Sequence, residues 1–121
     1  MKIRSTFLPA LAVVLLLSLM GCSRVIMPED AEKHVGETAT VEGKVSSVFV
    51  SKKNNAFLNM GGNYPSQAFT AALLARSADS SLIKNAGQYD GKTVAVTGRI
   101  ELYKGKPEII VNSAGQIKIK K

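Results

Sequence analysis

The chain has 121 residues, one cysteine, one histidine, no tryptophan and a formal net charge of +7. A chain of this length is expected to form a single domain. The lone cysteine excludes an internal disulfide and any zinc or redox site built from paired cysteines. The lone histidine excludes a cluster of histidines around a metal. We therefore expect neither a metal nor a cofactor.

The N-terminal residues have the pattern of a secretory signal. Lys2 and Arg4 form a short basic start, and residues 7–20 form an apolar run that is interrupted only by Pro9 and Ser18. A helix that spans a bilayer needs about 20 apolar residues, whereas this run has 14. A short apolar core after a basic flank is typical of a signal peptide.

The end of this segment carries a more specific motif. Its residues Leu19-Met20-Gly21-Cys22 resemble the lipobox of bacterial lipoproteins, in which the chain is cut before the cysteine and the thiol carries a diacylglyceryl group. Met20 is a less usual residue at its position. The resemblance implies a lipidated Cys22, whose acyl chains, such as palmitate, anchor the protein stably in a membrane. The alternative is an uncleaved N-terminal anchor with an incidental cysteine.

The lipobox divides the chain into three parts. We expect a lipoprotein signal peptide over residues 1–21, a lipidated tether over residues 22–28 and a folded domain over residues 29–121. From Cys22 onward the chain has 14 lysines and arginines against nine acidic residues, a net charge of +5. Ser23 follows the cysteine in place of an aspartate, so the resemblance favours the outer-membrane or periplasmic side of the bacterial envelope over the inner membrane.

Residues 28–36 predict a short helix. Pro28 suits a first helical turn, acidic residues follow at the positive end of the helix dipole, and Gly36 can adopt the left-handed conformation that ends a helix. His34 lies near the negative end of this helix. A helix-end role explains His34 more simply than a catalytic or metal-binding role.

Three strands are predicted next. Apolar and polar residues alternate from residue 38 to Val45, and the apolar phase then shifts to Val48 and Val50. This shift predicts a bulge that bends one long strand. Phe49 is out of phase with these apolar residues, as Phe57 is with Leu58 and Met60. A polar turn, a second strand, a loop and a third strand are predicted over residues 52–55, 56–60, 61–66 and 68–75.

The second half of the chain contains a helix and two further strands. Asp79 is a predicted N-cap, and Gly87 is a predicted end for this helix. Residues 93–103 predict the clearest strand of the chain. Its apolar face is expected to carry Val94, Val96, Gly98, Ile100 and Leu102. The last elements are a hairpin at residues 104–105, a strand through residues 108–111 and a short extension at Ile117 and Ile119.

The predicted order is three strands, a helix and two strands. This is the order of an all-β, five-stranded OB-fold barrel with Greek-key connections, in which a helix between strands three and four plugs one end. An SH3-like barrel is the alternative, and the position of the helix argues against it.

Several segments carry a resemblance to OB-fold proteins. The last predicted hairpin resembles that of nucleic-acid-binding OB-fold domains of the tRNA-anticodon-binding type, over residues 91–98 and 103–109. Other short segments resemble small exported bacterial OB-fold proteins that are described as DNA-binding, namely residues 34–37, 41–45, 57–59 and 64–65. The likeness extends over about residues 29–119. It implies a fold more than a ligand, because it rests on glycines, turn residues and core valines that any such barrel needs.

The OB-fold resemblance also implies a binding face. In that family, ligands lie on strands two and three, between the loops that join strands one to two and four to five. Lysines there can contact phosphates, and aromatic faces can stack bases at about 1–3 kcal/mol each. The alternative is that lysines at hairpin tips only solubilise the protein and protect sheet edges. The candidate ligand-binding residues are Phe49, Lys52, Lys53, Phe57, Arg99, Tyr103, Lys104 and Lys106.

These features favour a non-catalytic binding module in the bacterial envelope. One hypothesis is that it binds single-stranded nucleic acid through the basic and aromatic face. The alternative is an acidic envelope protein or glycan, because OB-folds also bind oligosaccharides and a positive charge attracts any acidic surface. We expect no enzyme, since HExxH, GxSxG and phosphate-binding glycine motifs are absent from the sequence. The strand carboxylates Glu42, Glu101 and Glu108 are expected to face solvent.

The predicted lipid anchor can be tested in cells. Cells that express the protein are labelled with a radioactive fatty acid, and the wild type is compared with Cys22→Ala. Label is expected in the wild type alone, because the diacylglyceryl group needs the Cys22 thiol. Equal labelling of the two forms would contradict the prediction.

Overall fold

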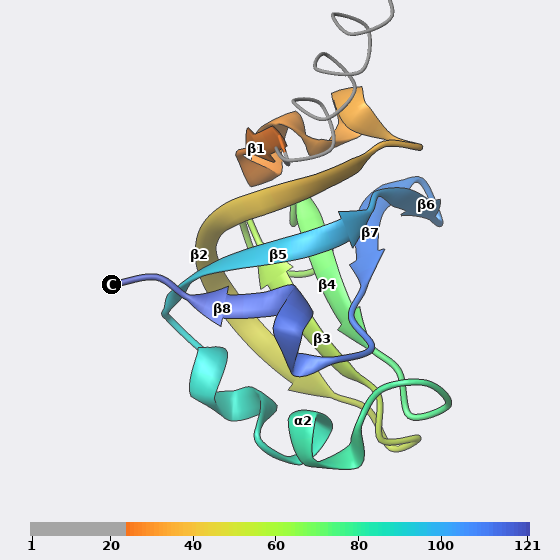
Figure 1. Ribbon diagram of the computed structural model, residues 1–121. Coiled ribbons are helices and arrows are strands. Elements are labelled where there is room, and N and C mark those ends of the chain that lie inside the picture. Colours follow the sequence, from red (N-terminus) through yellow and green to blue (C-terminus); the bar gives the residue numbers. More distant parts are fainter. Residues whose placement is uncertain (1–23) are drawn as a thin grey trace, which may run out of the picture.

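The structure, a computed structural model, describes residues 24–121. These residues form a mostly β fold in which one sheet has eight strands (Figure 1). The strand order is β6-β7-β4-β3-β2-β5-β8, and β1 pairs with β2 beside this path. The predicted signal peptide and Cys22 lie outside the described residues. Within residues 24–121, no helix is long and apolar enough to span a membrane.

The elements follow the predicted order along the chain. The strands are β1 (Arg24–Ile26), β2 (Thr38–Val50), β3 (Ala56–Met60), β4 (Phe69–Leu73), β5 (Thr93–Arg99), β6 (Glu101–Tyr103), β7 (Lys106–Ile110) and β8 (Ile117–Ile119). The helical segments are η1 (Pro28–His34), α2 (Ser80–Lys84), η2 (Ala86–Tyr89) and η3 (Ala114–Gln116). The predicted helix at residues 28–36 is confirmed as the 3-10 helix η1, and Gly36 after it has a φ of +93°.

The long strand β2 joins the two halves of the sheet. Its first half pairs antiparallel with β5, beginning with Thr38 opposite Arg99, and its second half pairs antiparallel with β3. The register shifts between Val45 and Ser47, which confirms the predicted bulge. Figure 1 shows β2 curving so that it reaches both halves. Val50, predicted in the core, is 47% exposed because it ends the strand at the turn to β3.

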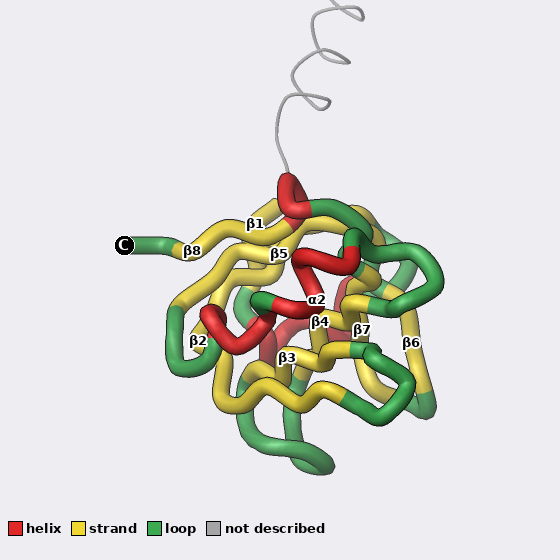
Figure 2. The backbone as a smooth tube through the Cα atoms, turned by 90° about the horizontal axis from the view of Figure 1, so that it is seen from below, coloured by secondary structure: helices red, strands yellow, loops and turns green. Residues whose placement is uncertain are grey.

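A helix closes one end of the fold, as predicted. The Asp79 carboxylate caps α2 by accepting the backbone N–H of Ser81 at 3.0 Å. Leu82 and Ile83 of α2 and Tyr89 of η2 are buried in the core. In the view from below, α2 lies in front of the strands (Figure 2).

Two features of the predicted barrel are wrong. The sheet has eight strands rather than five, and it is open, because no ladder joins β5 to β7 within residues 24–121. The predicted strand breaks at Ile100, whose side chain is fully buried and whose backbone turns toward the start of β2. The Ile100 N–H donates to Glu37 O at 2.9 Å, and Ile100 O accepts from Gly36 N at 2.7 Å. After this break β6 pairs with β7, so Leu102 is 58% exposed and does not join the core.

Both ends of the described chain add strands. Residues 24–26, which the sequence assigns to the tether, form β1 and run parallel to β2, with Arg24 opposite Ala39. Ile26 in this strand is buried. At the other end, the predicted extension is confirmed as β8, which pairs antiparallel with β5. These added strands account for part of the difference from a five-stranded barrel.

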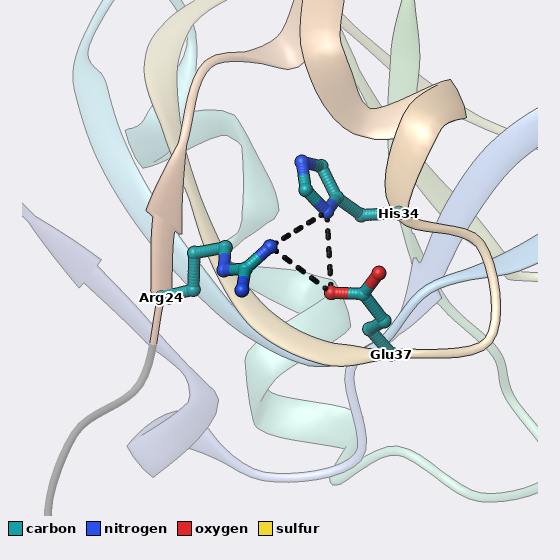
Figure 3. Close-up of polar contacts among 3 residues, drawn as sticks. All are labelled: Arg24, His34 and Glu37. Carbon is teal, nitrogen blue, oxygen red and sulfur yellow. Dashed lines mark hydrogen bonds and ion pairs between the residues drawn. The ribbon is translucent and has the colours of Figure 1, made fainter. Parts of the chain in front are cut away.

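A charged cluster fastens β1 to the turn between η1 and β2 (Figure 3). Arg24 Nη1 lies 3.5 Å from Glu37 Oε1 and 3.2 Å from His34 Nδ1. His34 Nδ1 also lies 3.2 Å from Glu37 Oε1. One Nδ1 cannot accept from the guanidinium and donate to the carboxylate at the same time, whereas the Arg24–Glu37 ion pair needs no particular tautomer. His34 is the last residue of η1, as the sequence predicts.

Gly43 provides a test of how η1 packs on the sheet. A Cβ at Gly43, in β2, would lie 2.6 Å from Pro28 Cγ and 2.9 Å from Pro28 Cδ. Gly43→Ala must therefore push the start of η1 away from β2, and we expect the free energy of unfolding to fall by about 1–3 kcal/mol. Urea denaturation measures this loss.

The matched control for this substitution is Gly87→Ala. A Cβ at Gly87 would meet nothing within 4 Å, so this variant should be as stable as the wild type or slightly more stable. If Gly43→Ala and Gly87→Ala have equal stabilities, Pro28 does not pack closely on β2.

Candidate ligand-binding groove

A groove of about 980 Å³ lies on the face of the sheet that is turned away from the core. It crosses the second half of β2 and then β3, β4 and β7, and it reaches the β6–β7 hairpin. Side chains alternate between the two faces along each strand, so the register of the sheet decides which residues line the groove.

Two phenylalanines form an aromatic pair in the groove. Phe49 of β2 lies opposite Phe57 of β3, with ring centroids 6.4 Å apart and an interplanar angle of 18°. Phe49 is 60% exposed, so one face of this pair is open to a flat partner. Both residues lie on the face opposite the core, as their phase in the sequence predicts.

A polar row crosses the sheet beside the phenylalanines. The residues that lie opposite one another in β2, β3, β4, β7 and β6 are Ser47, Asn59, Thr70, Glu108 and Glu101. Asn59 Nδ2 donates to Ser47 Oγ at 3.2 Å, and the Thr70 hydroxyl donates to Asn59 Oδ1 at 3.3 Å. Ser47, Asn59, Thr70 and Glu108 line the groove, and Asn59 and Thr70 are buried, so these four residues form its polar floor. Glu101 lies at the end of the row, outside the groove lining.

Gln67 extends the polar floor from the segment before β4. Its Nε2 donates to Thr70 Oγ1 at 3.1 Å, whereas its buried Oε1 has no hydrogen-bond partner within residues 24–121. Its backbone carbonyl accepts from Lys106 Nζ at 3.2 Å. Leaving a buried acceptor unpaired costs about 1–3 kcal/mol. A hydrogen-bond donor brought by a ligand would therefore stabilise this part of the floor.

Glu108 adds a carboxylate to the floor. It lies on the face turned away from the core, as expected, but its pairing with Thr70 across the parallel strands leaves it half-buried rather than fully exposed. Burial raises the pKa of Glu108, the nearby Glu101 raises it further, and Arg76 lowers it. Within residues 24–121, neither an ion pair nor a side-chain hydrogen bond engages this carboxylate.

The β6–β7 hairpin brings aromatic and basic groups to the groove. Tyr103 is 57% exposed, and Lys104 Nζ lies 5.4 Å from the centroid of its ring. Positive φ angles of 51° at Lys104 and 80° at Gly105 confirm the predicted two-residue turn. The register places Tyr103 opposite Lys106, on the far side of the polar row from the phenylalanines. Tyr64, in the loop after β3, is 76% exposed and also lines the groove.

The structure brings together five of the eight candidate residues. Those that line the groove are Phe49, Phe57, Tyr103, Lys104 and Lys106. Lys52 and Lys53 lie in the turn between β2 and β3, outside the groove lining. Arg99 ends β5, and its guanidinium lies beside Gly36. It lies outside the groove because β5 pairs with the first half of β2, whereas the groove uses the second half.

The polar floor is not among the features predicted from the sequence. Alternation along residues 56–60 places Asn59 on the same face as Phe57 and was a usable signal. No local signal places Gln67 or Glu108 there, because β4 and β7 are far apart in sequence and meet only in the folded sheet. In the part of the chain that the structure describes, no group of three or more His, Cys, Asp or Glu side chains could hold a metal.

Comparison with known proteins supports the fold. No family model and no curated protein sequence matches this chain. Among solved structures, OBody AM1L10 bound to hen egg-white lysozyme is 18% identical, with a TM-score of 0.61 over 82% of this chain and 95% of that one. Asparaginyl-tRNA synthetase from Pyrococcus horikoshii is 14% identical, with a TM-score of 0.58 over 78% of this chain and 22% of that one.

A third similar structure is aspartyl tRNA synthetase from Entamoeba histolytica. It is 17% identical to this chain, with a TM-score of 0.55 over 82% of this chain and 21% of that one. The chain therefore spans about a fifth of the length of these two synthetases. The likeness supports an OB-fold for the described domain, in agreement with its strand order.

Glu108 makes a pH-dependent contribution to stability. A carboxyl whose pKa is raised by folding stabilises the fold fully below its ordinary pKa of 4.5, and this contribution is lost as the pH rises through the raised value. Glu108→Gln is therefore expected to be more stable than the wild type at pH 7, by less than about 1 kcal/mol because solvent screens a half-buried group. The gain in stability should disappear when the pH is lowered to near the ordinary pKa of the carboxyl.

Thermal unfolding of the wild type and Glu108→Gln, at pH 7 and near pH 4.5, measures this difference in stability. In a Glu101→Gln background the gain from Glu108→Gln should shrink, because the Glu101 charge is one cause of the raised pKa. A gain that is the same at both pH values would mean that the substitution acts through packing rather than through the charge of Glu108.

Proposed function

We propose that this protein is a non-catalytic OB-fold binding module of the bacterial envelope, which binds single-stranded nucleic acid in the groove. The observation that carries the proposal is the set of exposed rings in one groove: the Phe49–Phe57 pair, Tyr64 and Tyr103. Every base has a flat face that stacks on such rings, at about 1–3 kcal/mol per base. Isolated aromatic rings on a surface need no ligand, but rings gathered in a groove favour one.

Positive charge is available beside these rings. Lys104 lies over the Tyr103 ring at the hairpin, where an ammonium group can contact the phosphate next to a stacked base. Lys52 and Lys53 lie in the β2–β3 turn, a few residues beyond Phe49. The fold supports the same proposal, since two of the similar structures are tRNA synthetases.

The lipid anchor remains part of the proposal and rests on the lipobox. If Cys22 carries the lipid, only Ser23 separates it from Arg24, which is already hydrogen-bonded into the sheet as the first residue of β1. A domain attached in this way would lie close to the membrane surface. The absence of catalysis is likewise proposed from the lack of catalytic motifs in the sequence.

A protein or glycan partner in the envelope is the second candidate. It is favoured by the OBody of similar fold, which is bound to lysozyme. Exposed tyrosine and phenylalanine rings also suit protein and sugar partners. The two candidates differ in their dependence on salt, because contacts with phosphates release counterions.

Fluorescence anisotropy of a labelled single-stranded oligonucleotide, measured over a salt series, tests the proposal. The full chain is used in a non-ionic detergent. Lys104→Ala is expected to weaken binding and to lower the slope of log K against log salt by about one. Lys118→Ala removes the same charge from β8, outside the groove, and is the matched control. Phe49→Ala should weaken binding about tenfold through lost stacking.

Two outcomes would contradict nucleic-acid binding. One is the absence of binding at low salt. The other is an equal effect of Lys104→Ala and Lys118→Ala, which would mean that net charge alone attracts the oligonucleotide. In either case, binding of purified envelope glycans or acidic proteins that is lost in Phe49→Ala would support the second candidate.

A further inference from the structure

We infer that the groove prefers guanine among the bases of single-stranded nucleic acid, and that Glu108 determines this preference. The inference rests on the proposed function and adds a base specificity to it. The polar floor contains acceptors to which no group of residues 24–121 donates a hydrogen bond.

The hydrogen bonds of the floor all run in one direction. Gln67 donates to Thr70, Thr70 donates to Asn59, and Asn59 donates to Ser47. The Thr70 hydrogen and one N–H of each amide are thereby used. Two acceptors at the start of this row remain without a donor within residues 24–121, namely Gln67 Oε1 and the Glu108 carboxylate.

Partial burial and the charge of Glu101 disfavour the negative charge of Glu108 and raise its pKa, and Arg76 offsets part of this effect. The Glu108 carboxylate is half-buried, lies opposite Glu101 on the neighbouring strand and is held by no ion pair. Gln67 is only 6% exposed and lines the same groove. Buried polar groups normally have partners, so the unpaired Gln67 Oε1, in the same groove as the half-buried Glu108 carboxylate, points to a ligand that brings hydrogen-bond donors.

Guanine brings the donors that fit a carboxylate. Its Watson–Crick edge carries the N1–H and an N–H of the 2-amino group side by side, so both oxygens of one carboxylate can accept at once. Thymine and uracil present a single N–H between two carbonyl oxygens, which a carboxylate repels. Cytosine and adenine present an amino group beside a ring acceptor. Guanine is therefore the base that satisfies Glu108 most completely.

The hairpin provides a stacking surface at the right place. Glu108 lies opposite Glu101, and Tyr103 lies opposite Lys106, so Tyr103 and Glu108 are diagonal neighbours on antiparallel strands. Diagonal neighbours have Cα atoms about 7–8 Å apart, within reach of long side chains. A base stacked on the exposed Tyr103 ring can thus direct its edge toward the Glu108 carboxylate. Lys104 above the same ring can contact the adjacent phosphate.

The test compares oligothymidylates that differ at one central base: thymine, guanine, hypoxanthine or adenine. Hypoxanthine keeps the N1–H of guanine and lacks its 2-amino group. We expect the full-length protein to bind the guanine oligonucleotide about tenfold more tightly than the all-thymine one. The hypoxanthine oligonucleotide should lie between them. A single guanine in thymine avoids the structures that runs of guanine form.

Two single substitutions distinguish an effect on base preference from an effect of net charge. They are Glu108→Gln and Glu101→Gln. Each removes one negative charge from the same pair of strands, and so each should tighten binding of the all-thymine oligonucleotide, whereas only Glu108→Gln also removes the proposed partner of guanine. Glu108→Gln is expected to bring the ratio of guanine to thymine affinity close to one. Glu101→Gln should keep that ratio, because Glu101 does not line the groove.

The possible outcomes distinguish this inference from the proposed function. Equal affinities of the wild type for all four oligonucleotides would overturn the guanine preference and leave nucleic-acid binding in place. A preference that survives Glu108→Gln would overturn the role of Glu108. The absence of binding to any of the four would overturn both the proposed function and this inference.

Discussion

The bulge in β2 is the constraint on which the groove depends. The register shift between Val45 and Ser47 changes the face on which alternate side chains lie. Before the shift, Val41 and Val45 face the core, and after it Ser47 and Phe49 line the groove. The same shift bends the strand, so that its two halves can pair with β5 and β3. One extra residue therefore produces both the curvature of the sheet and the composition of the groove.

The register of the sheet places the aromatic and the polar side chains of the groove in separate rows. The phenylalanine pair lies on one side of the polar row, and Tyr103 and Lys106 lie on the other. A flat ligand would meet rings on both sides and hydrogen-bonding groups between them. Such an arrangement separates affinity from specificity, because stacking tolerates any base whereas fixed acceptors distinguish among donors.

The polar floor also has a cost for the protein alone. Burial and the charge of Glu101 both disfavour the ionised form of Glu108, and Gln67 Oε1 is buried without a partner. Unfavourable groups of this kind are tolerated where the rest of the fold is well packed, here by fully buried side chains such as Leu58, Phe69 and Ile109. They mark the part of the sheet where the protein satisfies its own polar groups least well.

Four local features follow from neighbouring residues alone: the bulge of β2, the Asp79 cap of α2, the Lys104-Gly105 turn and the outward phase of Phe49 and Phe57. Each depends on neighbouring residues and on the period of two in a strand. Which strands lie side by side depends instead on the packing of the folded chain. The parallel pairing of β4 with β7 put Glu108 beside Thr70, the break at Ile100 turned Leu102 outward, and β5 kept Arg99 away from the groove. Alternation assigns a residue to a face, whereas its neighbours across the sheet are set by packing between segments that are distant in the chain.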